Sequence, residues 1–147
     1  MRGLMMFLVI LWATPLGLAS ASSEVKEIAG DVCQKNDFPA FFRFYAEAPE
    51  KIQFEYIKWP LKTVGNDGDT LGYQQKNNAE KMILSAKELQ EFNRKNKATY
   101  NYHLKKEGRG YFVMLALKDA GFDEGYTFEW ENNCWKLTVL HENDTGI

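Results

Sequence analysis

The amino-acid sequence predicts an α+β protein, in which a curved antiparallel sheet of about four to six strands packs against two or three N-terminal and central helices. Three patterns carry this prediction. Over residues 38–45, aromatic residues recur at the spacing of one helix face. Residues 85–88 have the polar pattern that opens a helix. Over residues 99–141, apolar and polar residues alternate, as they do in strands with one buried face.

The first helix is predicted to begin after Asp37, whose carboxylate can accept a hydrogen bond from the first turn. Pro39 fits that turn, where its missing amide proton is not needed. Pro49 interrupts the helix. Four aromatic residues form the apolar face, which predicts a core helix: Phe38, Phe41, Phe42 and Tyr45.

Residues 52–61 allow two interpretations, because their apolar positions shift phase by one. Either a helix runs to about Phe54 before a short strand, or the whole segment is a strand with a bulge near Tyr56 and Ile57. Pro60 cannot donate a ladder hydrogen bond, so it requires an edge position or the end of a ladder.

Residues 64–69 are rich in Gly, Asn and Asp, which predicts a turn before a short strand over residues 71–75. The spacing of Asp67 and Asp69 is also found in calcium-binding loops. However, Leu71 stands where such a loop needs a third oxygen ligand. The pattern therefore favours a turn over a calcium site.

A capping box formed by Ser85 and Glu88 predicts a second helix, with Leu89 and Phe92 on its apolar face. After this helix, the spacing of apolar residues changes to the period of two that is typical of strands. Turns rich in Gly or Asn separate these strands, which predicts an antiparallel meander. The predicted strands are residues 99–106, 110–118, 125–131 and 134–141.

The final hairpin turns at Asn132 and Asn133, which tolerate the positive φ of a two-residue turn. A longer turn is predicted over residues 119–125. Alternation puts Cys134 on the side of the sheet away from the core. The core side of the two strands is predicted to carry Tyr126, Phe128, Trp130, Trp135, Leu137 and Val139.

The composition is that of a globular protein, because 45% of the 147 residues are hydrophobic and 26% are charged. The chain has 18 Lys and Arg against 20 Asp and Glu, which gives a formal net charge of −2. This balance produces no general attraction to phosphate backbones. We therefore expect no nucleic-acid partner.

The N-terminus has the pattern of a secretory signal peptide: a basic start, an apolar run over residues 4–12 and the small residues Ala19 and Ala21. The apolar run is shorter than the roughly 20 residues that span a membrane, so no stable membrane anchor is expected. We expect cleavage near Ala21, a secreted or periplasmic location, and a single domain over residues 22–147.

Cys33 and Cys134 are the two cysteines of the chain, and export would carry them into an oxidising compartment. Such a pair usually forms a disulfide there. Because the two are far apart in sequence and do not have the C-x-x-C spacing of redox centres, we expect a structural bridge.

Two segments carry a family resemblance. Residues 54–61 (FEYIKWPL) and 128–137 (FEWENNCWKL) resemble the best-marked segments of a family of small secreted bacterial proteins of unassigned function. The resemblance implies the cone-shaped α+β fold of the nuclear-transport-factor-2-like (NTF2-like, cystatin-like) superfamily. It transfers no catalytic residue, because this superfamily includes enzymes and non-enzymes.

No cofactor or metal is expected, since the sequence lacks metal-binding, phosphate-loop and dinucleotide motifs. The best enzymatic hypothesis uses carboxylates. Residues 119–124 bring Asp119, Asp123 and Glu124 into one predicted loop, and the implied concave sheet could place such a base beside tyrosines, as in ketosteroid isomerase. The candidate pocket residues are Tyr100, Tyr102, His103, Tyr111, Asp119 and Asp123.

The chain contains 10 Phe, 7 Tyr and 4 Trp, a large number for one small domain. Aromatic side chains on the surface often anchor a partner. The sequence therefore favours a non-catalytic binding protein for a protein partner or a small apolar ligand, for example an immunity or inhibitor protein. The alternative is a small cone-fold hydrolase or isomerase with an Asp or His base. A homodimer stays open. The candidate binding residues are Trp59, Tyr73, Trp130 and Trp135.

Overall fold

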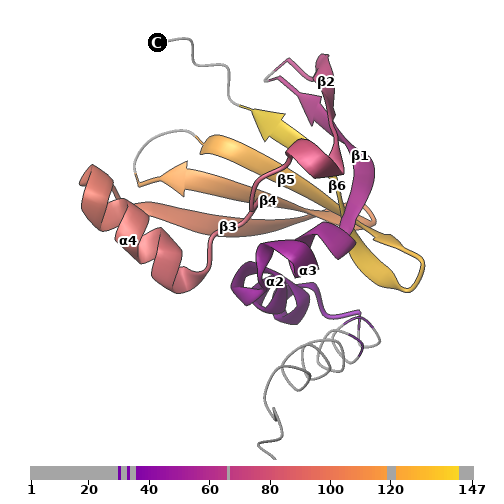
Figure 1. The fold of residues 1–147 in the computed structure, drawn as a ribbon, viewed down its shortest axis with the longest axis horizontal. Coiled ribbons are helices and arrows are strands. Elements are labelled where there is room, and N and C mark those ends of the chain that lie inside the picture. Colours follow the sequence, from indigo (N-terminus) through magenta and orange to yellow (C-terminus); the bar gives the residue numbers. More distant parts are fainter. Residues whose placement is uncertain (1–29, 31–32, 34–35, 66, 119–121, 143–147) are drawn as a thin grey trace, which may run out of the picture.

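Six strands form one sheet in the order β2-β1-β6-β5-β4-β3 (Figure 1). The structure is a computed structural model, and it describes residues 30, 33, 36–65, 67–118 and 122–142, without the side chains of residues 78, 122 and 123. The elements are α2 Phe38–Glu47, α3 Glu50–Glu55, β1 Ile57–Val64, β2 Thr70–Gln74, η1 Lys76–Asn78, α4 Ala86–Asn96, β3 Tyr100–Glu107, β4 Gly110–Leu117, β5 Phe122–Glu131 and β6 Cys134–Glu142. The predicted signal segment over residues 1–21 lies outside the described residues.

The sheet confirms the predicted α+β class and the antiparallel meander from β3 to β6. One pairing differs from the expected antiparallel pattern. Strand β1 runs parallel to β6, so a strand from the first half of the chain pairs with the last strand. Strand β2 then pairs with β1 as an antiparallel edge strand.

Helix α2 begins and packs as its sequence predicts. The Asp37 carboxylate accepts a hydrogen bond from the Ala40 amide at 3.1 Å. All four aromatic residues of the predicted apolar face are buried. They contact Tyr111, Phe128 and Trp135 of the sheet. We call the sheet face beneath α2 the inner face and the opposite one the outer face.

The structure decides between the two interpretations of residues 52–61. Helix α3 ends at Glu55 and β1 begins at Ile57. Strand β1 is a central strand, but Pro60 falls in an interruption of both ladders. Pairing with β6 skips from Ile57 to Lys62, and pairing with β2 begins at Leu61. Pro60 therefore loses no ladder hydrogen bond.

The alternation of β6 shifts by one residue at a bulge. Thr127 pairs with Val139 and Phe128 pairs with Leu137, which leaves Thr138 without an opposite residue. Beyond this bulge the buried position is Leu140, whereas Val139 is only half-buried. The prediction that Val139 lies on the core side was therefore wrong.

Strand β5 begins at Phe122, three residues before its predicted start at Gly125. Asp123 and Glu124 thus belong to a strand, and the prediction that they lie in a loop was wrong. Glu124 pairs with Leu115 on one side and with Glu142 on the other. A strand register, rather than a turn, therefore fixes the direction of the Glu124 side chain.

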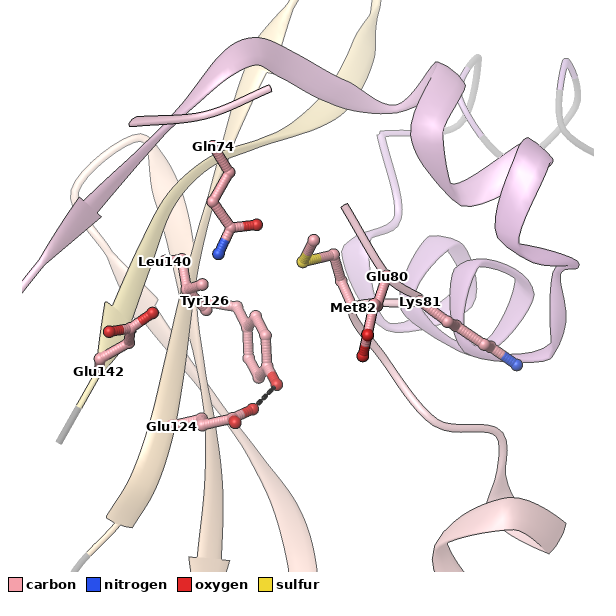
Figure 2. A pocket seen from close by; sticks show the side chains of 8 residues that line it. All are labelled: Gln74, Glu80, Lys81, Met82, Glu124, Tyr126, Leu140 and Glu142. Atoms are coloured by element: carbon pink, nitrogen blue, oxygen red, sulfur yellow. Dashed lines mark hydrogen bonds between the residues drawn. The ribbon is translucent and has the colours of Figure 1, made fainter. Parts of the chain in front are cut away.

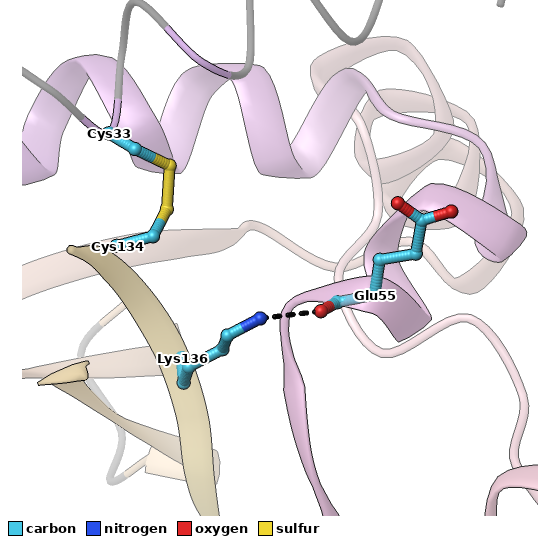
Figure 3. Close-up of a disulfide and its surroundings, with 4 residues drawn as sticks. All are labelled: Cys33, Glu55, Cys134 and Lys136. Carbon is cyan, nitrogen blue, oxygen red and sulfur yellow. Dashed lines mark hydrogen bonds between the residues drawn. A yellow bond between two sulfur atoms is a disulfide. The ribbon is translucent and has the colours of Figure 1, made fainter. Parts of the chain in front are cut away.

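Cys33 and Cys134 form the predicted disulfide across a sequence separation of 101 residues (Figure 3). Both belong to the hydrophobic core, although Cys134 was expected on the side away from it. Beside the bridge, the Lys136 ammonium donates to the Glu55 carbonyl at 2.6 Å. A closed loop of this length contributes about 4.7 kcal/mol by chain entropy. The disulfide is compatible with an extracellular or periplasmic protein. Within the described part of the chain, no helix is long and apolar enough to cross a membrane.

Candidate functional site

A cavity of about 360 Å³ opens at the end of the inner face where β5 begins and β6 ends (Figure 2). We call it the acidic pocket. Its walls come from the end of β2, from the segment over residues 80–82, and from β5 and β6. The lining residues are Gln74, Glu80, Lys81, Met82, Glu124, Tyr126, Leu140 and Glu142.

Strand geometry directs the side chains of β5 and β6 into this pocket. Residues two apart in a strand share a face, so Glu124 lies on the inner face with Tyr126, and Glu142 lies there with Leu140. The direct pairing of Glu124 with Glu142 brings the two carboxylates to neighbouring strands. The register of the sheet thus concentrates negative charge at this end.

Tyr126 donates a hydrogen bond from its hydroxyl to the Glu124 carboxylate (Figure 2). The Tyr126 side chain is only 1% exposed. Burial, followed by the nearby Glu124 charge, raises the pKa of Tyr126 far above its ordinary value. The phenol therefore keeps its proton and acts as a fixed donor that orients the Glu124 carboxylate.

Lys81, the one cation among the described lining residues, is already paired. The Lys81 ammonium lies 2.5 Å from the Glu88 carboxylate of α4. Figure 2 shows the Lys81 side chain directed away from Glu124 and Glu142. The hydrogen bond from Lys81, followed by those from Ser85, lowers the pKa of Glu88 to about 2. The remaining charges of the lining are the carboxylates of Glu80, Glu124 and Glu142.

A buried glutamine holds the wall that carries Glu80, Lys81 and Met82. Gln53 is fully buried, and its amide nitrogen donates to the Tyr45 carbonyl at 2.9 Å and to the Ile83 carbonyl at 2.8 Å. Its amide oxygen accepts from the Ile83 nitrogen at 3.2 Å. The Gln53 side chain thus satisfies both backbone groups of Ile83, as a neighbouring strand would. Gln53 belongs to no recognisable sequence motif, so its bonds to Ile83 were not predictable from the sequence.

Tyr102 supports the same segment from β3. Its hydroxyl accepts a hydrogen bond from the Leu84 amide at 3.0 Å. Burial raises the pKa of Tyr102 to about 12. The capping box confirms the predicted start of α4 beside this contact, since the Ser85 hydroxyl accepts from the Glu88 amide and the Glu88 carboxylate accepts from the Ser85 amide. The segment before α4 is therefore held at Ile83 and Leu84.

The structure does not bring together the four candidate pocket residues that it describes fully. His103 is exposed on the outer face, because adjacent strand residues point to opposite faces and Tyr102 points inward. Tyr100 packs on Phe92 of α4. Tyr111 lies on β4 six residues before Leu117, the partner of Tyr100, which separates the two tyrosines by about 20 Å. Asp119 and the side chain of Asp123 lie outside the described residues.

The four candidate binding residues likewise do not form one surface. Tyr73 is 60% exposed on the edge strand β2. Trp59 is half-buried, and its indole nitrogen donates to the Phe54 carbonyl at 3.0 Å. Trp135 is 4% exposed and belongs to the core. Trp130 contacts Trp135 edge to face at the far end of the inner face from the acidic pocket.

No protein-family model matches the chain, and no curated protein matches it closely enough to count as a relative. Similar solved structures include a cystatin-like protein from Bacteroides caccae, at 18% identity and a TM-score of 0.46, over 73% of this chain and 76% of that chain. An NTF2-like protein of unknown function from Cytophaga hutchinsonii has 12% identity and a TM-score of 0.27, over 82% and 87% of the two chains.

An NTF-2 like protein of unknown function from Silicibacter pomeroyi has 14% identity and a TM-score of 0.31, over 83% of this chain and 91% of that chain. These neighbours are described as cystatin-like or NTF2-like proteins. Their descriptions assign no ligand or activity.

Proposed function

We propose that the chain is a secreted or periplasmic, non-catalytic binding protein whose acidic pocket takes a small organic ligand with a positively charged amine. The observation that carries the proposal is the Glu124 carboxylate, which a buried tyrosine fixes in a cavity shared with Glu80 and Glu142. Lys81 does not neutralise this charge, because it is paired with Glu88.

The size and chemistry of the pocket favour a small amphipathic ligand over the purely apolar one that the sequence suggested. A volume of about 360 Å³ falls within the range of small-molecule sites. Met82 and Leu140 offer apolar contact, and the carboxylates offer contacts for a cation. A ligand with an apolar body and an ammonium head uses both.

The electrostatic contribution is moderate because the pocket is open to water. A charge pair about 4 Å apart contributes about 1 kcal/mol in water and more where solvent is excluded. Three carboxylates, each at that distance from one ammonium, would supply roughly 3 kcal/mol, or about a hundredfold in Kd. Glu124 contributes most reliably, because its carboxylate is already oriented and loses little freedom on binding.

One observation favours the alternative function, a small hydrolase or isomerase. A carboxylate in contact with a tyrosine inside a concave pocket is an arrangement that such an enzyme could use. However, Glu124 is exposed to solvent, whereas a general base usually works in a site from which water is excluded. We therefore favour ligand binding.

The test compares two probes of the same shape, 2-phenylethylamine and 2-phenylethanol, by calorimetric titration of the disulfide-bonded protein. The proposal predicts that the amine binds at least about tenfold more tightly than the alcohol. Equal affinities would show that the carboxylates do not recognise charge and would contradict the proposal. Turnover of an ester or enone substrate that is lost in Glu124→Gln would support the enzyme instead.

A further inference from the structure

A second cavity, of about 390 Å³, lies near the β3–β4 and β5–β6 turns, at the opposite end of the sheet from the acidic pocket. Trp130 is six residues beyond Glu124 on β5, which separates the two cavities by about 20 Å. We call this cavity the basic aromatic pocket. Its lining includes Asn36, Lys106, Arg109, Tyr111, Trp130 and Trp135.

The charge of this pocket is opposite to that of the first. Of the described lining residues, Lys106 and Arg109 are charged and none is a carboxylate. Among the described residues, neither cation has an ion-pair partner. Gly108, with a φ of +56°, permits the tight turn that carries Arg109 to the rim. Two uncompensated cations thus border one cavity.

Aromatic rings form the walls. Trp135 meets Trp130 and Tyr111 edge to face, at centroid distances of 5.2 and 5.5 Å. Tyr111 stacks on Phe38 of α2 at 4.2 Å. Trp130 is only half-buried, so part of its ring remains available for contact. These mutual contacts restrict the rings and provide a preorganised surface for a flat ligand.

An unpaired donor supplies an independent indication of a ligand. The indole nitrogen of Trp135 is buried and has no hydrogen-bond acceptor within the described part of the chain. A buried donor without an acceptor is unusual and carries an uncompensated desolvation cost. Because Trp135 lines the cavity, a ligand oxygen bound there could supply the missing acceptor after a small shift of the rim.

We propose that the basic aromatic pocket binds a small ring-bearing carboxylate. The ring packs on Trp130, and the carboxylate lies between Lys106 and Arg109, with an oxygen directed toward the Trp135 indole. Ammonium, guanidinium and indole groups are all donors, so this set suits an acceptor-only anion. An arginine can also hold a carboxylate through two parallel hydrogen bonds. This site goes beyond the proposed function and does not depend on it.

Two classes of ligand combine a ring with a carboxylate: aromatic acids and acidic sugars. One probe of each class distinguishes between them. Benzoate represents the aromatic acid, glucuronate represents the sugar, and benzyl alcohol is the neutral control. We expect one or both carboxylates to bind the disulfide-bonded chain, and the tighter of the two identifies the source. Benzyl alcohol should bind at least about tenfold more weakly. Failure of both carboxylates to bind at millimolar concentration would overturn the proposal.

Variants and an internal reference locate the site. Lys106→Gln combined with Arg109→Gln should weaken carboxylate binding at least about tenfold. Lys105→Gln removes one positive charge from the adjacent residue, which is exposed and paired with Glu107, and should leave binding unchanged. In nitrogen–proton NMR spectra, the Trp135 indole signal should shift on binding. The Trp59 indole, already bonded to the Phe54 carbonyl, should not.

Two results would overturn the proposal. Equal binding by the double variant and the wild type would overturn the proposal, because the cations would then not hold the anion. Binding that shifts other signals but leaves the Trp135 indole unmoved would also overturn it. Loss of the amine site through Glu124→Gln should leave carboxylate binding intact, so failure of one proposal is distinguishable from failure of the other.

Discussion

Replacement of Gln53 by leucine tests how the wall of the acidic pocket is held. Leucine has a similar volume but no polar atoms, so the change removes the three hydrogen bonds to Tyr45 and Ile83. The Tyr45 carbonyl retains a bond from the Ala48 amide. The Ile83 nitrogen and carbonyl, in a residue that is 0% exposed, lose the partner that Gln53 provides.

The expected cost follows from those two backbone groups. An unsatisfied buried polar group costs about 1–3 kcal/mol, so the pair predicts a loss of about 3 kcal/mol in the free energy of unfolding. For a domain of this size, that loss corresponds to a fall of roughly 10 °C in Tm. The segment that carries Glu80 and Met82 should also lose protection, because Gln53 is its anchor to α3.

Urea unfolding at equilibrium gives the free-energy difference, and hydrogen exchange at Ile83 reports the local effect. Gln90→Leu is the matched control, since Gln90 is an exposed glutamine of α4. The control should change stability by less than about 0.5 kcal/mol. If Gln53→Leu were as stable as the control and Ile83 stayed protected, the anchoring role of Gln53 would be refuted.

Three further predictions concern stability. Ser85→Ala should cost about 1 kcal/mol in chemical unfolding, because it removes the cap of α4, and an unchanged midpoint would contradict this. Glu88 has a pKa lowered from 4.5 to about 2, so its stabilising effect is complete above its unfolded pKa and is lost as the pH falls toward about 2. Solvent screening keeps that effect below about 1 kcal/mol. The difference in the free energy of unfolding between the wild type and Glu88→Gln, followed as the pH falls toward about 2, measures it. Cys33→Ser with Cys134→Ser should lower the free energy of unfolding by about 4–5 kcal/mol, and a loss below about 1 kcal/mol would show that the bridge is dispensable.

Local patterns predicted most of the fold. The aromatic face of α2, the capping box at Ser85 and the positive φ of Asn132 and Asn133 each depend on residues close in sequence, and each is confirmed. The parallel pairing of β1 with β6 depends on residues about 80 apart, which periodicity does not encode. The bulge at Thr138 likewise shows only in the pairing of β6 with β5.

The acidic pocket was only partly predictable for the same reason. Glu124 was grouped with acidic and glycine residues that are typical of turns, and this hid its position two residues from Tyr126 on one strand face. With the strand beginning at Phe122, alternation alone would have paired the two side chains. The contribution of Glu80 and of Gln53 depends on a segment folded across the sheet, which no local signal marks.

The affinity of 2-phenylethylamine for Glu124→Gln, compared with its affinity for Glu129→Gln, tests directly whether the acidic pocket binds an amine. The glutamine oxygen in Glu124→Gln can still accept the Tyr126 hydrogen bond, so the substitution removes charge but not shape. Glu129 lies on the same strand, is exposed and points to the other face, and therefore serves as the control. We expect a Kd about tenfold weaker for Glu124→Gln and an unchanged Kd for Glu129→Gln. Equal affinity in both variants and the wild type would show that the acidic pocket is not where the amine binds.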